Sequence, residues 1–314
     1  MNVRFWGVRG SIPTPLTSEQ VRRKIAAVVQ RIEKKDVESE ESRERFLARL
    51  PEYLFGTVGG NTTSLEVRLA DDTMILFDAG SGIRELGTQL KKRRGVKREY
   101  HLFFTHFHWD HLQGLPFFAP CFDPDVIINF YSEDEHLEEY LRGQMSFPYF
   151  PVALDVMAAK LNFHVLKENG SCTVANSVVT WRRVKHPGVC RSYAVSEEGK
   201  KLIFSTDTEL SEADFKRTPA NARFYKDANA IIMDSQYTLG EAIEKYDWGH
   251  SSYSLAVDFA SEWNIRVLVL FHHEPLYDDQ KMHNILKSAS WYSDHLEQKE
   301  LQIYLAREGL EIEL

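Results

Sequence analysis

The apolar residues of this chain fall into short runs that end in turns or polar groups, and this pattern predicts buried β-strands. We expect strands at 2–9, 73–77, 100–104, 125–131, 178–185, 201–206, 229–237, 265–271 and 301–306. Helical spacing separates several of these runs, notably at 83–92 and 280–297, and a further helix is expected to begin at 113. Because strands and helices alternate along the chain, the pattern favours a layered α/β fold.

Residues 18–54 interrupt this alternation with a different, helical pattern. Apolar residues recur there at helical spacing, at Val21, Ile25, Val28, Val29 and Ile32. A charged stretch at 34–42 separates this helix from a second one at about 43–50. The pattern predicts a helical insertion after the first strand. It could be a lid, an oligomer contact or a specificity element, and a solvated helical hairpin is the plain alternative.

A second interruption covers residues 133–163. An acidic helical segment is followed there by three aromatic residues, Phe147, Tyr149 and Phe150, which are interspersed with two prolines. Such a stiff segment can form an aromatic wall on which a base or another planar group stacks. Packing of the same rings against the core is the alternative. We therefore expect an arm beside the active site.

Composition and charge narrow the functional class. No apolar run approaches the roughly 18 residues of a membrane helix, and the first residues lack a signal-peptide core, so a soluble, cytoplasmic protein is expected. The net charge of −8 argues against a nucleic-acid partner. The basic run at 91–98 is the local exception, and we interpret it as a helix C-terminus. The three cysteines lack metal-site spacing, which favours reduced thiols.

Candidate chemistry is concentrated where the strand at 100–104 ends. Three histidines and an aspartate follow within six positions, as His106, His108, Asp110 and His111. Neutral imidazole and carboxylate are ligands that suit zinc, iron or manganese, and a loop at a strand end lets alternate side chains converge. The segment therefore predicts a metal site. A chance run of surface histidines is disfavoured because apolar residues are interleaved with these polar ones.

Three later strands also end in residues that can bind metals. His186 follows the strand at 178–185 and precedes a Pro-Gly turn, and Asp207 follows the strand at 201–206. His272 follows the strand at 265–271, with His273 as an adjacent alternative. Asp207 could instead cap a helix, a common role for aspartate.

The H-x-H-x-D-H pattern over residues 106–111 resembles the signature of the metallo-β-lactamase fold hydrolases, and the order of the later strand ends extends the resemblance over most of the chain. The resemblance implies a single domain, 1–314, built as a four-layer αββα sandwich. It also implies two divalent metal ions, with zinc favoured and manganese or iron compatible. His106, His108 and His186 would hold the first ion, while Asp110, His111 and His272 would hold the second, with Asp207 bridging them.

The same resemblance suggests roles for residues around the metals. Asp78, which follows the strand at 73–77, would orient the ligands of the loop at 105–111, called the metal loop below, without binding a metal itself. Glu209 and His273 would likewise support ligands without binding a metal. The segment around Gly249 and His250 resembles the corresponding segment in the phosphodiesterase branch of this superfamily. In that branch the histidine faces the substrate phosphate. We therefore expect His250 and Asp110 to be catalytic residues.

These features together predict a binuclear metal-dependent phosphodiesterase that acts through a metal-bridging hydroxide. Segments such as Trp-Gly-Val-Arg-Gly-Ser at 6–11 look most like bacterial proteins near the cyclic-phosphate phosphodiesterases, so a cyclic nucleotide or another small phosphodiester is the expected substrate. Two alternatives remain. One is hydrolysis of another ester class, such as a lactone or thioester, and the other is RNA processing, as in tRNA 3′-processing endonucleases. A non-catalytic nucleotide sensor ranks lower, no membrane partner is expected, and the insertion is compatible with a homodimer.

Overall fold

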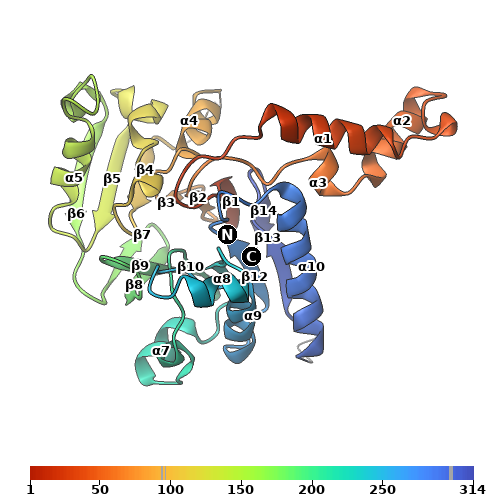
Figure 1. The fold of residues 1–314 in the computed structure, drawn as a ribbon. Helices are drawn as coiled ribbons and strands as arrows, with labels where there is room; N and C mark the ends of the chain where they lie inside the picture. Colours follow the sequence, from red (N-terminus) through yellow and green to blue (C-terminus); the bar gives the residue numbers. More distant parts are fainter. Residues whose placement is uncertain (93–94, 96, 297–299) are drawn as a thin grey trace.

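The computed structural model describes residues 1–92, 95, 97–296 and 300–314. Part of the basic run at 91–98, namely residues 93, 94 and 96, lies outside these ranges, as does the last residue of the helix expected at 280–297. Helices and strands within the described ranges form four layers, with two sheets inside and helices on both outer faces (Figure 1). The predicted αββα layering is confirmed.

Two sheets of seven strands each account for the strands of the described residues. The first sheet runs in the order β14 (Glu311–Glu313), β1 (Asn2–Gly7), β2 (Ser64–Arg68), β3 (Met74–Phe77), β4 (Glu99–Phe103), β5 (Ile127–Ser132) and β6 (Lys160–Val165). The second runs in the order β13 (Gln302–Leu305), β12 (Val267–Phe271), β11 (Ala230–Asp234), β10 (Lys200–Ser205), β9 (Cys190–Glu197), β8 (Ser177–Val184) and β7 (Ser171–Val174).

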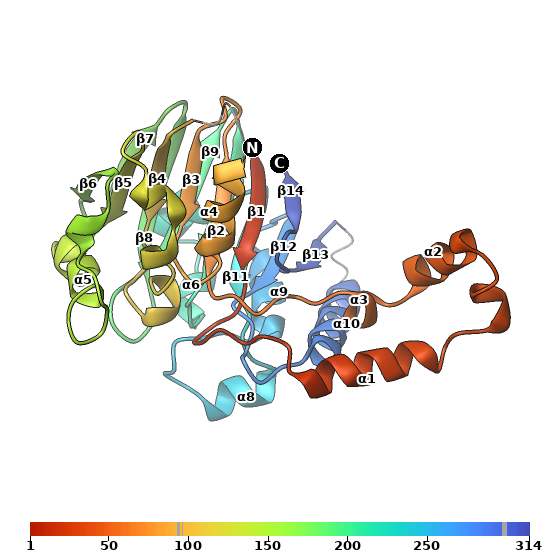
Figure 2. The same ribbon diagram turned by 90° about the horizontal axis from the view of Figure 1, so that it is seen from above.

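The helices cover the outer faces of the sheets (Figure 2). The first sheet carries α4 (Ile83–Lys92) and α5 (Leu137–Gln144), and the second carries α7 (Pro219–Tyr225), α9 (Tyr253–Glu262) and α10 (Asp279–His295). Two further short helices are α6 (Glu212–Phe215) and α8 (Leu239–Glu244). The insertion forms α1 (Ser18–Val29), α2 (Glu40–Arg49) and α3 (Glu52–Phe55), and the first residues of α2 fall within the stretch expected to separate the two helices.

The layering follows from the alternation of side chains along each strand. In β3, Leu76 packs into the core under α4 while its neighbour Phe77 packs between the two sheets. In β10, Ile203 packs against the helices of the second sheet while Phe204 meets Phe77 in the middle, with ring centroids 5.4 Å apart. Successive strand residues point to opposite faces, so a fully apolar strand must be covered on both sides.

The parallel strands explain where a site can form. Strands β3 to β6 are parallel to one another, and so are strands β10 to β13. The carboxyl ends of the strands within each parallel set therefore lie at one edge of the sheet, where the following loops meet. Asp78 and the metal loop follow β3 and β4 on one sheet, while Asp207 and His272 follow β10 and β12 on the other.

One local expectation is wrong. We expected a helix to begin at 113, but the chain forms only the 3-10 turns η3 (Leu115–Phe117) and η4 (Ala119–Phe122) there, each with a proline in its first positions. Proline removes a backbone donor and disrupts a longer helix. In the segment 133–163, α5 corresponds to the expected acidic helical segment, and the segment ends within the edge strand β6, which was not expected. No helix among the described residues has both the length and the apolar character needed to cross a membrane.

Candidate metal centre

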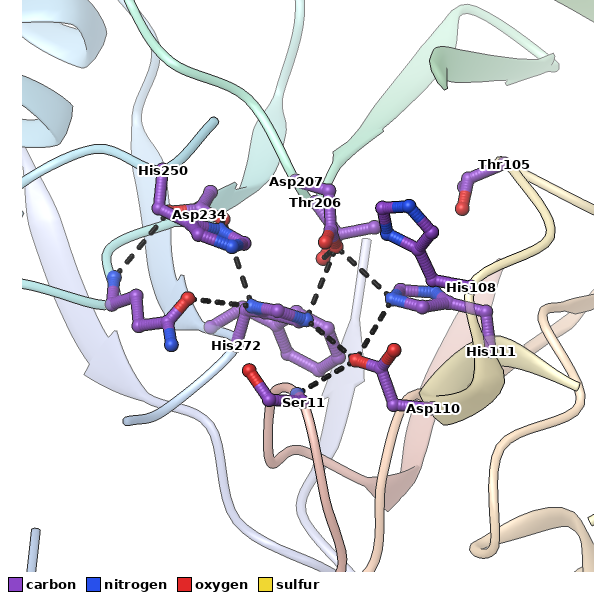
Figure 3. Close-up of polar contacts among 12 residues, drawn as sticks. Ser11, Thr105, His108, Asp110, His111, Thr206, Asp207, Asp234, His250 and His272 are labelled. Atoms are coloured by element: carbon purple, nitrogen blue, oxygen red, sulfur yellow. Dashed lines mark hydrogen bonds and ion pairs between the residues drawn. The ribbon is translucent and has the colours of Figure 1, made fainter. Parts of the chain in front are cut away.

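Polar side chains from both sheets converge at the edge where the parallel strands end (Figure 3). In each of three groups of these side chains, the ligand atoms all lie within 4.8 Å of one another; two groups share Asp207, and the third consists of Asp234, His250 and His272. The first group consists of His106, His108, His186 and Asp207, and the second consists of Asp110, His111, Asp207 and His272. All seven candidates from the sequence therefore lie in one cluster, and Asp207 belongs to both groups.

Asp207 stands between the two groups and turns one oxygen to each. Its Oδ1 lies 3.8 Å from Nε2 of His106 and 3.7 Å from Nε2 of His186. Its Oδ2 lies 3.2 Å from Nε2 of both His111 and His272. A carboxylate in this position can bind one cation through each oxygen, which is the arrangement of a bridging ligand in binuclear sites.

The cluster contains buried nitrogen atoms without a partner. Nε2 of His106 and Nε2 of His111 are both buried and accept or donate no hydrogen bond within the described part of the chain. Leaving such atoms unpaired costs free energy, about 1–3 kcal/mol for each. A cation bound between the histidines and carboxylates would satisfy them. The chemistry of the donors therefore fits a metal ion in each group.

Other residues hold the ligands in place from behind. The fully buried carboxylate of Asp78 accepts hydrogen bonds from the Thr105 backbone N–H and hydroxyl, both at 2.8 Å, and contacts Nδ1 of His111 at 2.9 Å. Contact with Nδ1 leaves Nε2 of His111 directed at the cluster, as ligand-orienting carboxylates do at metal sites. Burial raises the pKa of Asp78, against the opposing effect of His111.

The electrostatics favour ligand-competent protonation states on His106 and Asp207. At His111, burial is outweighed by Asp110, Asp207 and Asp78, which raise the pKa of this histidine well above its ordinary value. Burial lowers the pKa of His106 well below its ordinary value, so its imidazole is neutral. Burial alone would raise the pKa of Asp207, but the neighbouring His272, His111 and His106 outweigh it and hold that pKa well below the usual range. Neutral imidazole and ionised carboxylate are the forms that bind metals.

The loop after β1 contacts two residues of the second group, Asp110 and His272. The backbone N–H of Ser11 donates to Oδ2 of Asp110 at 2.8 Å. Gly10 lies close to the ring of His272, because a Cβ at this position would be 2.5 Å from Cε1 of that ring. Arg9 anchors the loop, because its buried guanidinium group donates to the carbonyl oxygens of Gly59, Glu274 and Tyr277.

The structure distinguishes the two adjacent histidines after β12. Nε2 of His272 lies 3.2 Å from Oδ2 of Asp110, inside the second group. Nε2 of His273 instead contacts the Ala306 carbonyl oxygen at 2.7 Å, and its side chain is fully buried. Burial and the nearby Arg9 lower the pKa of His273 to about 3. His273 is therefore placed as a neutral part of the core, and His272 lies in the cluster.

His250 lies beside the cluster and is paired with a carboxylate. Its Nδ1 is 2.7 Å from Oδ2 of Asp234, and its ring is stacked on His272 with centroids 5.0 Å apart. Burial acts to lower the pKa of His250, but Asp234 outweighs it and raises the pKa to about 9. His250 thus carries a proton at neutral pH and stands beside the two groups.

Glu209 and Gly249 shape the loop that carries His250. Glu209 accepts hydrogen bonds from the backbone N–H of Gly249 at 2.9 Å and from Lys185 at 2.6 Å, so it braces this loop and does not contact the ligands directly. The Gly249 carbonyl oxygen faces Nδ1 of His186 at 3.0 Å. A Cβ on Gly249 would lie 2.2 Å from that nitrogen, and the glycine has φ of +88°. Glycine is required there because the backbone approaches the His186 ring closely.

Sequence reasoning missed two residues at this site. Asp234 ends the buried strand β11, and the strand-end argument that selected Asp207 applies to it equally. Ser11 acts through its backbone N–H, which no side-chain pattern reveals.

Comparisons with known proteins give consistent results. A family model described as a β-lactamase superfamily domain matches residues 73–273. A ribonuclease Z of Streptococcus pyogenes serotype M5 (strain Manfredo) is 24% identical over 267 residues, covering 68% of this chain and 83% of that protein.

Two solved structures are similar in fold over nearly their whole length. Zn²⁺-bound PqqB from Methylobacterium extorquens has a TM-score of 0.68 at 14% identity and covers 100% of both chains. Unliganded yeast PDE1 has a TM-score of 0.64 at 14% identity and covers 100% of this chain and 99% of that one.

Proposed function

We propose that this chain, which belongs to the β-lactamase superfamily, is a metal-dependent hydrolase that cleaves phosphodiesters with two divalent ions. The observation that carries the proposal is the position of Asp207, whose two oxygens face two separate groups of histidines. A single ion would not need both groups. The similarity to a ribonuclease, an enzyme that cleaves phosphodiester bonds, supports the same class of reaction.

In this proposal the two groups divide the ligands as the sequence suggested. His106, His108 and His186 hold the first ion, and Asp110, His111 and His272 hold the second, with Asp207 contributing to both. Histidine nitrogen and carboxylate oxygen together suit zinc best among common divalent ions, while manganese and iron also accept them.

The protein residues would then position a substrate and move protons. When bound, the ions supply a water of lowered pKa and polarise a phosphoryl oxygen. Asp234 fixes Nδ1 of His250, which leaves the protonated Nε2 of His250 free to donate to a phosphoryl oxygen or to the leaving oxygen. The Ser11 N–H holds Asp110 in the orientation that faces His111 and His272.

Two exposed tryptophans support a small nucleotide as the substrate. Trp109 lies within the metal loop between His108 and Asp110, with 76% of its surface exposed, and Trp248 lies two residues before His250, with 61% exposed. Exposed aromatic rings beside a phosphate-cleaving site are suited to stacking on a base. The net charge of −8 disfavours a long polyanionic substrate.

An RNA substrate is the second candidate. The relative from Streptococcus pyogenes is named ribonuclease Z, and its alignment extends over 68% of this chain. This similarity weakens the expectation that nucleic acid is not a substrate. The same metal centre would serve both reactions, because the bond cleaved is a phosphodiester in each case.

The first experiment is hydrolysis of bis-p-nitrophenyl phosphate by protein of known metal content, with nitrocefin and a thioester as controls. The wild type should cleave the phosphodiester with about two metals per chain. Asp207→Ala should lose the activity. Asp125→Ala removes an exposed carboxylate two residues before the start of β5, away from the carboxyl ends of the strands, and should keep the activity. Cleavage of only the control substrates by the metal-loaded protein would overturn the proposal.

Cyclic mononucleotides and a structured precursor RNA then separate the two substrate candidates. Higher kcat/KM for a cyclic mononucleotide supports the small-substrate proposal. Specific endonucleolytic cleavage of the RNA, with weak activity on mononucleotides, supports the second candidate.

A further inference from the structure

The buried ring of His272 turns one nitrogen to the ligand cluster and the other away from it. Its Nε2 lies 3.2 Å from carboxylate oxygens of both Asp110 and Asp207. Its Nδ1 lies 3.3 Å from Oε1 of Gln236. An imidazole can bind a cation through Nε2 only when its proton is on Nδ1. The partner of Nδ1 therefore decides whether His272 can act as a ligand.

Two side-chain oxygens lie near Nδ1 of His272. One is Oδ2 of Asp234 at 3.7 Å, but this oxygen lies closer to Nδ1 of His250, at 2.7 Å. Asp234, His250 and His272 lie together in Figure 3. The other oxygen is Oε1 of Gln236, which is nearer to His272. Because Asp234 is engaged with His250, Gln236 is the hydrogen-bond partner of His272.

A second contact sets the orientation of the Gln236 amide. Nε2 of Gln236 donates to Oε2 of Glu274 at 3.0 Å, and Lys245 lies 3.7 Å from the same oxygen. A carboxylate accepts hydrogen bonds and donates none, so the amide turns its NH2 group to Glu274 and its oxygen to His272. Gln236 and Glu274 are 2% and 8% exposed, so water does not replace these contacts.

The second sheet places these side chains next to one another. Strands β11 and β12 are parallel neighbours, and Asp234 is paired with Phe271 at their carboxyl ends. The Ser235 backbone N–H then donates to the Phe271 carbonyl oxygen at 3.1 Å. Gln236 follows β11 and Glu274 follows β12, so both lie at the edge of the sheet where the ligands gather.

We propose that Gln236 and Glu274 are positioning residues for the second metal ion, because they hold His272 in the tautomer that turns the Nε2 lone pair to the cluster. Glu274 orients the Gln236 amide, the amide oxygen accepts the proton of Nδ1, and Nε2 is left free to bind the ion. Neither residue touches the ion or the substrate. The inference rests on the proposed two-ion function.

The effect of Gln236 should be confined to one ion. Among the described residues, its side chain makes no hydrogen bond beyond the two given above. Other ligand histidines have different partners, since Nδ1 of His111 contacts Asp78 and Nδ1 of His186 faces the Gly249 carbonyl oxygen. Loss of Gln236 should therefore weaken the second ion and leave the first ion bound.

Zinc affinity, measured by competition with a chromophoric chelator, tests the proposal without any substrate. Gln236→Leu removes both hydrogen bonds and should weaken one of the two zinc ions about ten- to hundredfold, as loss of a ligand-orienting residue does elsewhere. Gln144→Leu is the matched control, because the side-chain nitrogen of Gln144 in α5 is also buried and has no partner among the described residues. It should keep the wild-type affinities for both ions.

Two ligand variants identify which ion is affected. His106→Ala removes a ligand of the first group only, and Asp110→Ala removes a ligand of the second group only. In the His106→Ala background, Gln236→Leu should weaken the remaining ion by the same factor. In the Asp110→Ala background, it should leave the remaining ion unchanged. Equal weakening in both backgrounds would reveal a general loss of structure and would overturn the positioning role.

Exchange of the two side chains tests the tautomer itself. Gln236→Glu sets two carboxylates against each other where the wild type has a hydrogen bond of 3.0 Å, and Glu274→Gln allows the Gln236 amide to turn its NH2 group to His272. Each single variant should bind the second zinc ion more weakly. The double variant Gln236→Glu, Glu274→Gln again places an acceptor beside His272 with a donor behind it, so it should recover most of the lost affinity.

Wild-type affinity for both zinc ions in Gln236→Leu overturns the proposal. A double variant that binds zinc no better than the weaker single variant also overturns it. Circular dichroism shows that each variant is folded, and the exchange series decides the question if Gln236→Leu does not fold. A wild type that binds two zinc ions but cleaves no phosphodiester would refute the proposed function and leave these zinc affinities unaffected, so the two failures are distinguishable.

Discussion

The backbone N–H of Ser11 donates a hydrogen bond of 2.8 Å to Oδ2 of Asp110, which lies 99 residues later in the chain. The contact connects the loop after β1 to the metal loop after β4, across the first sheet. Gly10, the preceding residue, touches the ring of His272 from the other sheet. The short loop therefore orients two residues of the second ligand group, Asp110 and His272. It makes no such contact with the histidines of the first group.

Gly10→Ala should selectively weaken the second metal site. The new methyl group would lie 2.5 Å from Cε1 of His272, so the ring must move out of the cluster. Metal analysis after exhaustive dialysis should give about one metal per chain where the wild type retains about two. Gly143→Ala in α5 is the control, since a Cβ there meets no atom within 4 Å. Retention of two tightly bound metals by Gly10→Ala would contradict the role assigned to the loop.

His250→Gln should reduce catalysis without removing metal. His250 belongs to neither of the two groups that share Asp207, and its protonated ring stands beside them. Loss of a proton donor at this position should lower kcat by about 10²–10³-fold. Metal content, measured on the same samples, should stay at the wild-type value. A fall in metal content that parallels the fall in kcat would indicate instead that His250 is a ligand.

The tryptophans near the site should affect substrate binding more than turnover. Loss of a stacking ring costs about 1–3 kcal/mol, so Trp109→Ala or Trp248→Ala should raise KM for a cyclic nucleotide about tenfold with a smaller change in kcat. Trp291→Ala is the control, because Trp291 of α10 is also 62% exposed and packs against the tilted ring of His295 in the same helix. An equal KM for all three variants and the wild type would rule out the stacking role.

Removal of the metals should destabilise the protein. The cluster contains buried histidine nitrogens that lack partners within the described residues, and any ion that binds only the folded chain stabilises it. At about a hundred times the dissociation constant, one ion contributes about 2.7 kcal/mol, which corresponds to a Tm change of several degrees for a protein of this size. A chelator should therefore lower Tm, and added Zn²⁺ should restore it. An unchanged Tm would count against structural metal binding.

Glu308 should make the stability depend on pH. Burial raises the pKa of this carboxyl above its ordinary value, although the amide groups of Asn61 oppose the shift. A raised folded-state pKa means that the protonated form is favoured in the folded chain, so stability is lost as pH rises through that pKa. The Tm of the wild type relative to Glu308→Gln should therefore fall between pH 4 and pH 7. A rise over the same interval would show that the charged form is the stabilised one.

The pattern of apolar runs was sufficient to predict the layered fold, because a strand that is apolar on both faces must be covered on both faces. The same pattern placed candidate ligands at the ends of strands, while the order of the motifs, through the resemblance to the metallo-β-lactamase fold hydrolases, selected His186, Asp207 and His272 among them. His106, His108 and His111 could be singled out because they are close in sequence and follow one strand directly.

Only the tertiary structure decided between His272 and His273. The two are adjacent after β12, and their directions depend on the backbone of His272, which has φ of +61°. The contact of Ser11 with Asp110 was equally hidden, because a backbone N–H has no signature in the amino-acid sequence. The exposed apolar side chains Val21, Ile25 and Val29 of α1 are a third case. Helical spacing predicts an apolar face on this helix, but only the packing of distant elements decides whether other described residues cover that face.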